Sequence, residues 1–98
     1  MKTLSEIKEI LRKHKKELKE KYKVKSIAIF GSYARNEQTE KSDIDILVEF
    51  YKTPDYIKFF ELEDYLSDLL GVKVDLVIKG AIKNPYIKKS IEEDLIYV

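Results

Sequence analysis

The sequence predicts a small α+β domain with elements in the order helix, strand, loop, strand, helix, strand, helix. Two observations carry this prediction. Apolar residues recur at helical spacing in long segments that begin and end with capping residues. Between these segments lie short apolar runs, bounded by glycine or polar residues, that are typical of strands. The 98 residues are enough for one hydrophobic core, so we expect a single domain over residues 1–98.

The first half of the chain is expected to form one helix and two strands. Thr3 and Glu6 form a capping box, and the apolar stripe behind them predicts one amphipathic helix over residues 4–22. The run VKSIAIF at 24–30 is too short for a helix and ends at a glycine, which indicates a buried strand. The segment DIDILVEF at 43–50 alternates with period two, which indicates a second strand.

The second half is expected to add two helices and a third strand. The Thr-Pro pair at 53–54 supplies an N-cap and a first-turn proline, and Gly71 lies where a C-terminal cap belongs. The run VKVDLVI at 72–78 then predicts the third strand. The Asn-Pro pair at 84–85 begins a final helix, and the terminal residues IYV are expected to form a short edge strand.

Composition restricts both the location and the metal chemistry. No apolar run reaches the ~20 residues of a membrane span, and the N-terminus lacks the apolar stretch of a signal peptide, so we expect a cytoplasmic protein. Cysteine is absent, so any metal must be held by oxygen ligands or by His14. This favours Mg²⁺ or Mn²⁺. We expect His14 itself to be a boundary residue of the core rather than a ligand.

Charge is divided unevenly along the chain. Residues 1–25 contain ten Lys or Arg and four Glu. Residues 26–98 contain nine Lys or Arg and fourteen Asp or Glu. A nucleic-acid partner could be bound by the basic first helix. The simpler interpretation is a solvated helix face beside an acidic body, which we favour.

Three aspartates are expected to gather on one face of the sheet. Side chains two apart in a strand point the same way, so Asp43 and Asp45 lie opposite the apolar side chains of their strand. Asp75 interrupts the third strand in the same manner, and a crossover through the intervening helix would place it beside Asp45. Carboxylates that close repel one another unless a cation lies between them. The pattern therefore predicts a site for one or two divalent cations.

The loop between the first two strands has features of a phosphate-binding turn. Gly31 lets backbone approach a ligand, and Ser32 can donate its hydroxyl beside free N–H groups of the next turn. Arg35, one turn later, could contact phosphate or brace the acids. Tyr33 could stack on a base, or occupy a variable surface position. Each feature also has a plain structural interpretation, with Gly31 in an ordinary turn, Asp43 as a cap and Asp75 on the rim.

Taken together, the residues resemble a known family. The sequence resembles the DNA polymerase β-like nucleotidyltransferase superfamily in Gly31-Ser32, Ala34-Arg35, Ser42-Asp43-Ile44-Asp45 and the later acid. More narrowly, it resembles the minimal nucleotidyltransferases. Their signature is Gly-Ser-x-Ala-Arg-Gly, a spacer, then Ser-Asp-Ile-Asp-Leu. The resemblance covers essentially the whole chain. One departure is Asn36 in place of the final glycine of the first motif, a residue that also tolerates left-handed backbone.

The resemblance implies a fold and a reaction. The fold is a two-layer α/β sandwich with a small mixed sheet, helices on one face and the site on the other. The reaction is transfer of AMP from ATP to a hydroxyl, with release of pyrophosphate. By position, Gly31 and Ser32 would hold the β- and γ-phosphates, and Asp43 and Asp45 would ligate two Mg²⁺ ions. Asp75 would complete the metal site and help activate the acceptor hydroxyl.

The resemblance also implies a partner. Many small members of this family act as antitoxins of HEPN-domain ribonucleases by adding AMP to a tyrosine of the toxin, and this is the function we expect here. One alternative is nucleotidyl transfer to a small molecule or an RNA end. Another is a module that binds the toxin without catalysis, although three acids on one open face argue against it.

Overall fold

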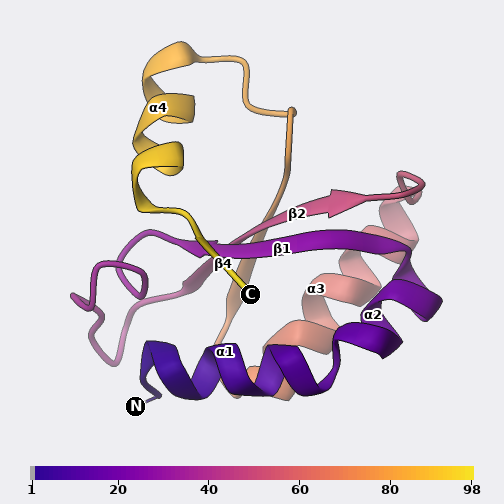
Figure 1. The fold of residues 1–98 in the computed structure, drawn as a ribbon, viewed down its shortest axis with the longest axis horizontal. Helices are drawn as coiled ribbons and strands as arrows, with labels where there is room; N and C mark the ends of the chain where they lie inside the picture. Colours follow the sequence, from indigo (N-terminus) through magenta and orange to yellow (C-terminus); the bar gives the residue numbers. More distant parts are fainter. Residues whose placement is uncertain (1) are drawn as a thin grey trace.

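The computed structural model describes residues 2–98, which form four helices and a four-stranded sheet (Figure 1). In chain order the elements are α1 (Leu4–Lys13), α2 (Lys15–Tyr22), β1 (Val24–Phe30), β2 (Ile44–Phe50), α3 (Tyr56–Leu70), β3 (Val74–Ile78), α4 (Pro85–Asp94) and β4 (Ile96–Tyr97). No helix in this part of the chain is both long enough and apolar enough to cross a membrane.

The sheet has the strand order β3-β2-β1-β4 and is mixed. Strand β1 pairs antiparallel with β2 on one side and with the short β4 on the other. Strands β2 and β3 are parallel and are joined by the α3 crossover. The expected neighbourhood of the second and third strands is confirmed, as is the edge strand at the end of the chain.

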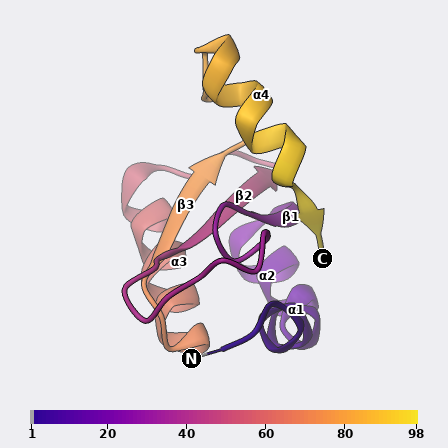
Figure 2. The same cartoon turned by 90° about the vertical axis from the view of Figure 1, so that its left-hand side faces the viewer.

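The sheet has one face covered by α1, α2 and α3, while α4 stands on the opposite side (Figures 1 and 2). The two-layer, mixed-sheet fold expected from the sequence is thereby confirmed. Alternate residues of the strands face the three helices and are buried. The largest fully buried aliphatic side chains are Ile7, Leu11, Leu18, Ile27, Ile29, Ile44, Ile46, Val48, Leu62, Leu66 and Leu70.

The predicted helix over residues 4–22 is interrupted at His14, so that prediction is wrong in its continuity. The Nδ1–H of His14 donates to the carbonyl of Ile10 at 2.8 Å, and the backbone N–H of His14 bonds to Leu11 at 3.2 Å in a tightened turn. The carbonyl of His14 then accepts from Leu18 at 2.9 Å and α2 begins. His14 is half-buried, as expected for a boundary residue.

Other element boundaries differ from the expected ones by one or two residues. Helix α3 is capped by Asp55, whose carboxylate accepts from the N–H of Lys58 at 2.8 Å, rather than by the Thr-Pro pair. Its predicted C-terminal cap, Gly71, is confirmed by a φ of 69°. Strand β3 begins at Val74 instead of 72, and β2 begins directly after Asp43.

Candidate active site

The three predicted acids lie at one end of the parallel pair β2 and β3. Asp45 and Asp75 are direct partners in the register of that pair, which places their backbones about 4.8 Å apart. Asp43 immediately precedes β2 and is exposed, and Asp75 is also exposed. All three carboxylates therefore come from the same end and the same face of the sheet, on the side opposite α1, α2 and α3.

Asp45 lies in an environment that disfavours its ionised form. Partial burial raises the pKa of Asp45, and repulsion from Asp75 and then from Asp43 raises the pKa further. The guanidinium of Arg35 opposes these effects by lowering the pKa of Asp45. A carboxylate whose ionised form is disfavoured by two neighbouring carboxylates is stabilised by a cation placed among them.

Gly31 lies against Asp45 across the sheet. Phe30, the last residue of β1, is the register partner of Asp45 on the side away from β3, and Gly31 follows with a φ of 75°. A Cβ at this position would collide with Oδ2 of Asp45. The glycine is therefore required both by its left-handed backbone and by the closeness of the carboxylate. Asp45 thus sits between the loop glycine and Asp75.

The loop after Gly31 forms one tight turn. The carbonyl of Gly31 accepts from the N–H of Arg35 at 3.1 Å, and the carbonyl of Ser32 accepts from the N–H of Glu37 at 2.8 Å. Within residues 2–98, the N–H groups of residues 32–34 donate to no backbone carbonyl. Such uncommitted donors at the start of a turn can bind an anion. Asn36 adopts a φ of 58°, so it takes the left-handed backbone for which the family's usual glycine is suited.

Tyr33 does not contribute its ring to this surface. It is only 1% exposed and belongs to the hydrophobic core. Both interpretations given to it above, a base-stacking residue and a surface position, are wrong. The ring instead anchors the loop to the core, which holds Gly31 and Ser32 in position.

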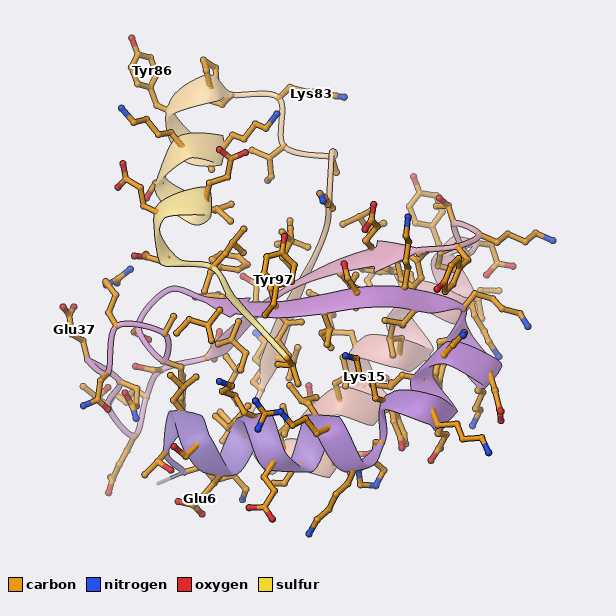
Figure 3. The ribbon with its side chains drawn as sticks, viewed as in Figure 1. Glu6, Lys15, Glu37, Lys83, Tyr86 and Tyr97 are labelled. Carbon is orange, nitrogen blue, oxygen red and sulfur yellow. The ribbon has the colours of Figure 1, made fainter. Side chains whose placement is uncertain are left out.

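Arg35 joins the loop to α4. Its Nη1 donates to Oδ2 of Asp94 at 2.6 Å and its Nε to Oε2 of Glu37 at 3.3 Å, and these two bonds, Asp94 first, raise the pKa of Arg35. Glu37 itself points outward at the edge of the loop (Figure 3). Arg35 was expected either to contact phosphate or to brace the site aspartates, but its side-chain bonds are with Asp94 and Glu37, and a role toward phosphate stays a prediction.

A cavity of about 250 Å³ lies between the loop and α4. Of the three predicted acids, only Asp45 lines this cavity, and Gly31 and Arg35 form one of its walls. The other wall is one side of α4, formed by Ile87, Ser90, Ile91 and Asp94. The sequence analysis did not assign these four residues to the site. Their spacing of three and four residues predicted a helix face, but nothing local indicated which surface that face would meet.

A larger, apolar groove of about 390 Å³ lies on the other side of α4. Leu47 of β2 forms its floor, and Ile91, Leu95 and Tyr97 form its sides. Leu47 is two residues after Asp45 and on the same face of the sheet. Lys79, Lys88 and Glu92 also line it, but none of the three predicted aspartates does, so we place the chemistry in the smaller cavity.

The donor set suits a hard divalent cation, although the cage is incomplete. Within residues 2–98 no three acidic or imidazole groups are arranged to hold a metal ion by themselves. Mg²⁺ is characteristically bound by one or two carboxylates together with water and substrate phosphates. Asp45 and its partner Asp75, with Asp43 adjacent, provide oxygen ligands of this kind.

The chain is similar to several known proteins. The sequence profile of the nucleotidyltransferase domain matches residues 11–98. The chain is 94% identical, over all 98 residues of both proteins, to a Methanocaldococcus jannaschii protein provisionally named protein adenylyltransferase MJ0128. It is 51% identical to the protein adenylyltransferase MntA of Thermococcus cleftensis, over 100% of this chain and 98% of that protein.

Solved structures of related proteins have the same fold. A structure provisionally described as a minimal nucleotidyltransferase superposes with a TM-score of 0.77 at 28% identity, over 97% of this chain and 95% of that one. A chain in the structure of tri-AMPylated Shewanella oneidensis HEPN toxin in complex with MNT antitoxin gives a TM-score of 0.66 at 27% identity, over 93% and 70% of the two chains.

Proposed function

This chain belongs to the nucleotidyltransferase domain family, and from that premise we propose that it transfers AMP from ATP to a tyrosine hydroxyl of a HEPN toxin and so acts as the toxin's antitoxin. It is an enzyme of the nucleotidyltransferase class, with protein adenylyltransferases among its close relatives. The observation that carries the proposal is the position of Asp45, whose carboxylate fills the space that a side chain at residue 31 would need and lies beside a second carboxylate in register.

The loop is proposed to hold the triphosphate. Gly31 lets the backbone approach the β- and γ-phosphates, and the Ser32 hydroxyl and the free N–H groups of the turn donate to their oxygens. Arg35 contributes positive charge to the same cavity while remaining paired with Asp94. These contacts orient the nucleotide so that its α-phosphorus faces the carboxylates.

The carboxylates are proposed to bind Mg²⁺ and to assist the transfer. Asp43, Asp45 and Asp75 would hold the ions, which supply charge neutralisation of the phosphates when bound. The acceptor oxygen forms a bond to the α-phosphorus as the bond from that phosphorus to the bridging oxygen of the β-phosphate breaks, and pyrophosphate leaves. Asp75, the most accessible of the acids on β2 and β3, accepts the proton released by the hydroxyl.

The partner is proposed to supply the acceptor and to complete the site. The S. oneidensis HEPN toxin is AMP-modified in complex with its MNT antitoxin. In this chain, the groove of about 390 Å³ on the other side of α4 would receive the aromatic side chain, and Leu47 and Ile91 would contact its ring. The acceptor hydroxyl would then approach the carboxylates along the sheet, from the side opposite the triphosphate loop.

The deciding experiment is an intact-mass measurement on a co-expressed HEPN partner after incubation with this chain, ATP and Mg²⁺. We expect mass increments of whole AMP units, located on a tyrosine by fragmentation. The increments should vanish with Asp43→Asn plus Asp45→Asn. The matched control is Asp64→Asn plus Asp68→Asn, which removes the same charge from the exposed side of α3 and should leave the increments unchanged.

Two outcomes would contradict the proposal. Increments that persist in the Asp43→Asn plus Asp45→Asn protein would remove the carboxylates from the chemistry. A stable complex that never gains AMP would make the chain a binding module. Transfer to an RNA end would instead appear as AMP on added RNA with none on the partner.

A further inference from the structure

A second cleft lies at the opposite end of β1 from the carboxylates, and its charge has the opposite sign. It has a volume of about 380 Å³ and is formed by α2, the first residues of β1 and the residue that follows β2. Four of its lining residues are lysines: Lys15, Lys16, Lys19 and Lys25. No acidic residue of the described chain lines it. Because β1 spans about 20 Å, this cleft is separate from the candidate active site.

None of the four lysines of the cleft forms an ion pair with an acidic residue in the described part of the chain, where the pairs use Lys13, Arg35, Lys58 and Lys79. The nearest acids in sequence, Glu17 and Glu20, line a separate hollow with Lys16. Lys15 reaches from the start of α2 and donates to the carbonyl of Val98 at 2.9 Å (Figure 3). Because Lys15 makes this bond, the positive charge of the cleft that is open to an anion is that of Lys16, Lys19 and Lys25.

An exposed aromatic ring lies among these lysines. Tyr51 is 60% exposed, and its ring centroid lies 5.7 Å from Nζ of Lys19 and 6.0 Å from Nζ of Lys25. Its backbone N–H donates to the carbonyl of Lys23 at 2.8 Å, which holds the main chain of Tyr51 at the end of β2. An aromatic platform beside several cations is the combination that single-stranded nucleic acids use, with bases on the ring and phosphates on the cations.

We propose that this cleft is a binding site for single-stranded nucleic acid, in which Lys16, Lys19 and Lys25 contact phosphates and Tyr51 stacks on a base. The lysines suit phosphate oxygens as compact point charges, and the platform is not needed to bind an acidic peptide. The site is a docking surface and not the point of nucleotidyl transfer, because Asp45 lies at the far end of the strand. The inference stands independently of the proposed toxin partner.

The test is fluorescence anisotropy of a labelled, mixed-sequence oligoribonucleotide titrated with the full chain at several salt concentrations. We expect Lys19→Glu plus Lys25→Glu to reduce the slope of log affinity against log salt by at least about 1.4, since each phosphate contact on a single strand contributes about 0.7. The matched control, Lys83→Glu plus Lys89→Glu, changes the net charge equally on a distant part of the molecule. It should leave the slope unchanged.

A second pair of variants tests the ring. Tyr51→Ala should lower affinity about tenfold through loss of one stacked base, whereas Tyr51→Phe should retain the wild-type affinity. Thermal melting of each variant shows that it is folded. Three results would overturn the proposal: no oligonucleotide binding by the wild type at low salt, equal losses in the two charge-reversal variants, or polyglutamate bound as tightly as RNA at the same lysines.

Discussion

The two faces of β2 show how one strand can serve stability on one side and chemistry on the other. Ile44, Ile46 and Val48 are fully buried against three helices. Asp45, between two of them in sequence, points to the other face and is held beside Asp75 in an environment that raises its pKa. One face is optimised for the folded state, whereas the other keeps an arrangement that folding alone would disfavour. Substitutions on the two faces should therefore have opposite consequences.

The largest effect is expected at Asp45 itself. Asp45→Asn should lower the rate of nucleotidyl transfer by about 10²- to 10³-fold, because a charged ligand and its several kcal/mol of transition-state stabilisation are lost. The same substitution should raise the melting temperature measured in chelator at neutral pH, because repulsion with Asp75 and Asp43 disappears. A melting temperature that falls would refute our interpretation of the electrostatics of this face.

The pH dependence follows from the same carboxylate. The folded protein binds a proton at Asp45 more readily than the unfolded chain does, because the pKa of Asp45 is raised on folding. In metal-free buffer the wild type should therefore lose stability as pH rises from the ordinary aspartate value through the raised one. Chemical denaturation across this pH range would measure it. This loss of stability with rising pH should be absent from the Asp45→Asn protein.

On the buried face, Ile46→Ala should lower the free energy of unfolding by about 2–5 kcal/mol, since it leaves a cavity in the core. Activity per folded molecule should change little, because the side chain does not reach the site. Urea unfolding followed by rate measurements on the folded fraction would check both statements. A large loss of specific activity with intact fold would show that the two faces are coupled.

An intermediate effect is expected at Gly31. In Gly31→Ala the new Cβ must displace the carboxylate of Asp45, and the left-handed backbone adds about 1–2 kcal/mol of strain. Both stability and nucleotide binding should fall. Titration with a non-hydrolysable ATP analogue, together with thermal melting, would separate the two losses. Gly80→Ala, at a comparably left-handed glycine with open space around it, is the matched control and should affect stability alone.

The smallest effect is expected at the contact between the loop and α4. Asp94→Asn leaves a weaker bond to Arg35, and because the Arg35 side chain is exposed to solvent the substitution should change stability only slightly. We expect a few-fold change in the affinity for ATP, since Arg35 would then be free to move. Isothermal titration would measure it. Glu9→Gln, which breaks an exposed pair in α1, should change no ATP affinity.

The sequence was informative wherever a local period determined the structure. Alternation in β2 and an acid in β3 were enough to predict which side Asp45 and Asp75 would share, and the crossover rule then placed them together. The conformation of Asn36 was also predictable, because few residues accept a positive φ. Predicted roles for these residues in catalysis remain predictions.

The sequence was uninformative wherever the structure depends on distant contacts. Tyr33 lies in a polar loop without periodicity, so its burial depends on packing that no local pattern reports. Asp94 meets Arg35 across 59 residues of chain, and the period of α4 cannot say which face of the sheet the helix will approach. The start of α3 was misplaced because Thr53 and Asp55, two residues apart, are both good caps, and the side-chain geometry decides between them.

Helix α4 is attached more loosely than the elements around it. None of its side chains is fully buried, and Tyr86 near its first turn extends into solvent (Figure 3). Beyond the helix, β4 contributes only two residues to the sheet. Segments with few buried contacts open at a fraction of the global unfolding free energy, so the amide hydrogens of α4 should exchange with solvent while β1, β2 and β3 stay protected. One half of the candidate active site is therefore built into the sheet. The other half is carried by α4, which can open locally while the core stays folded.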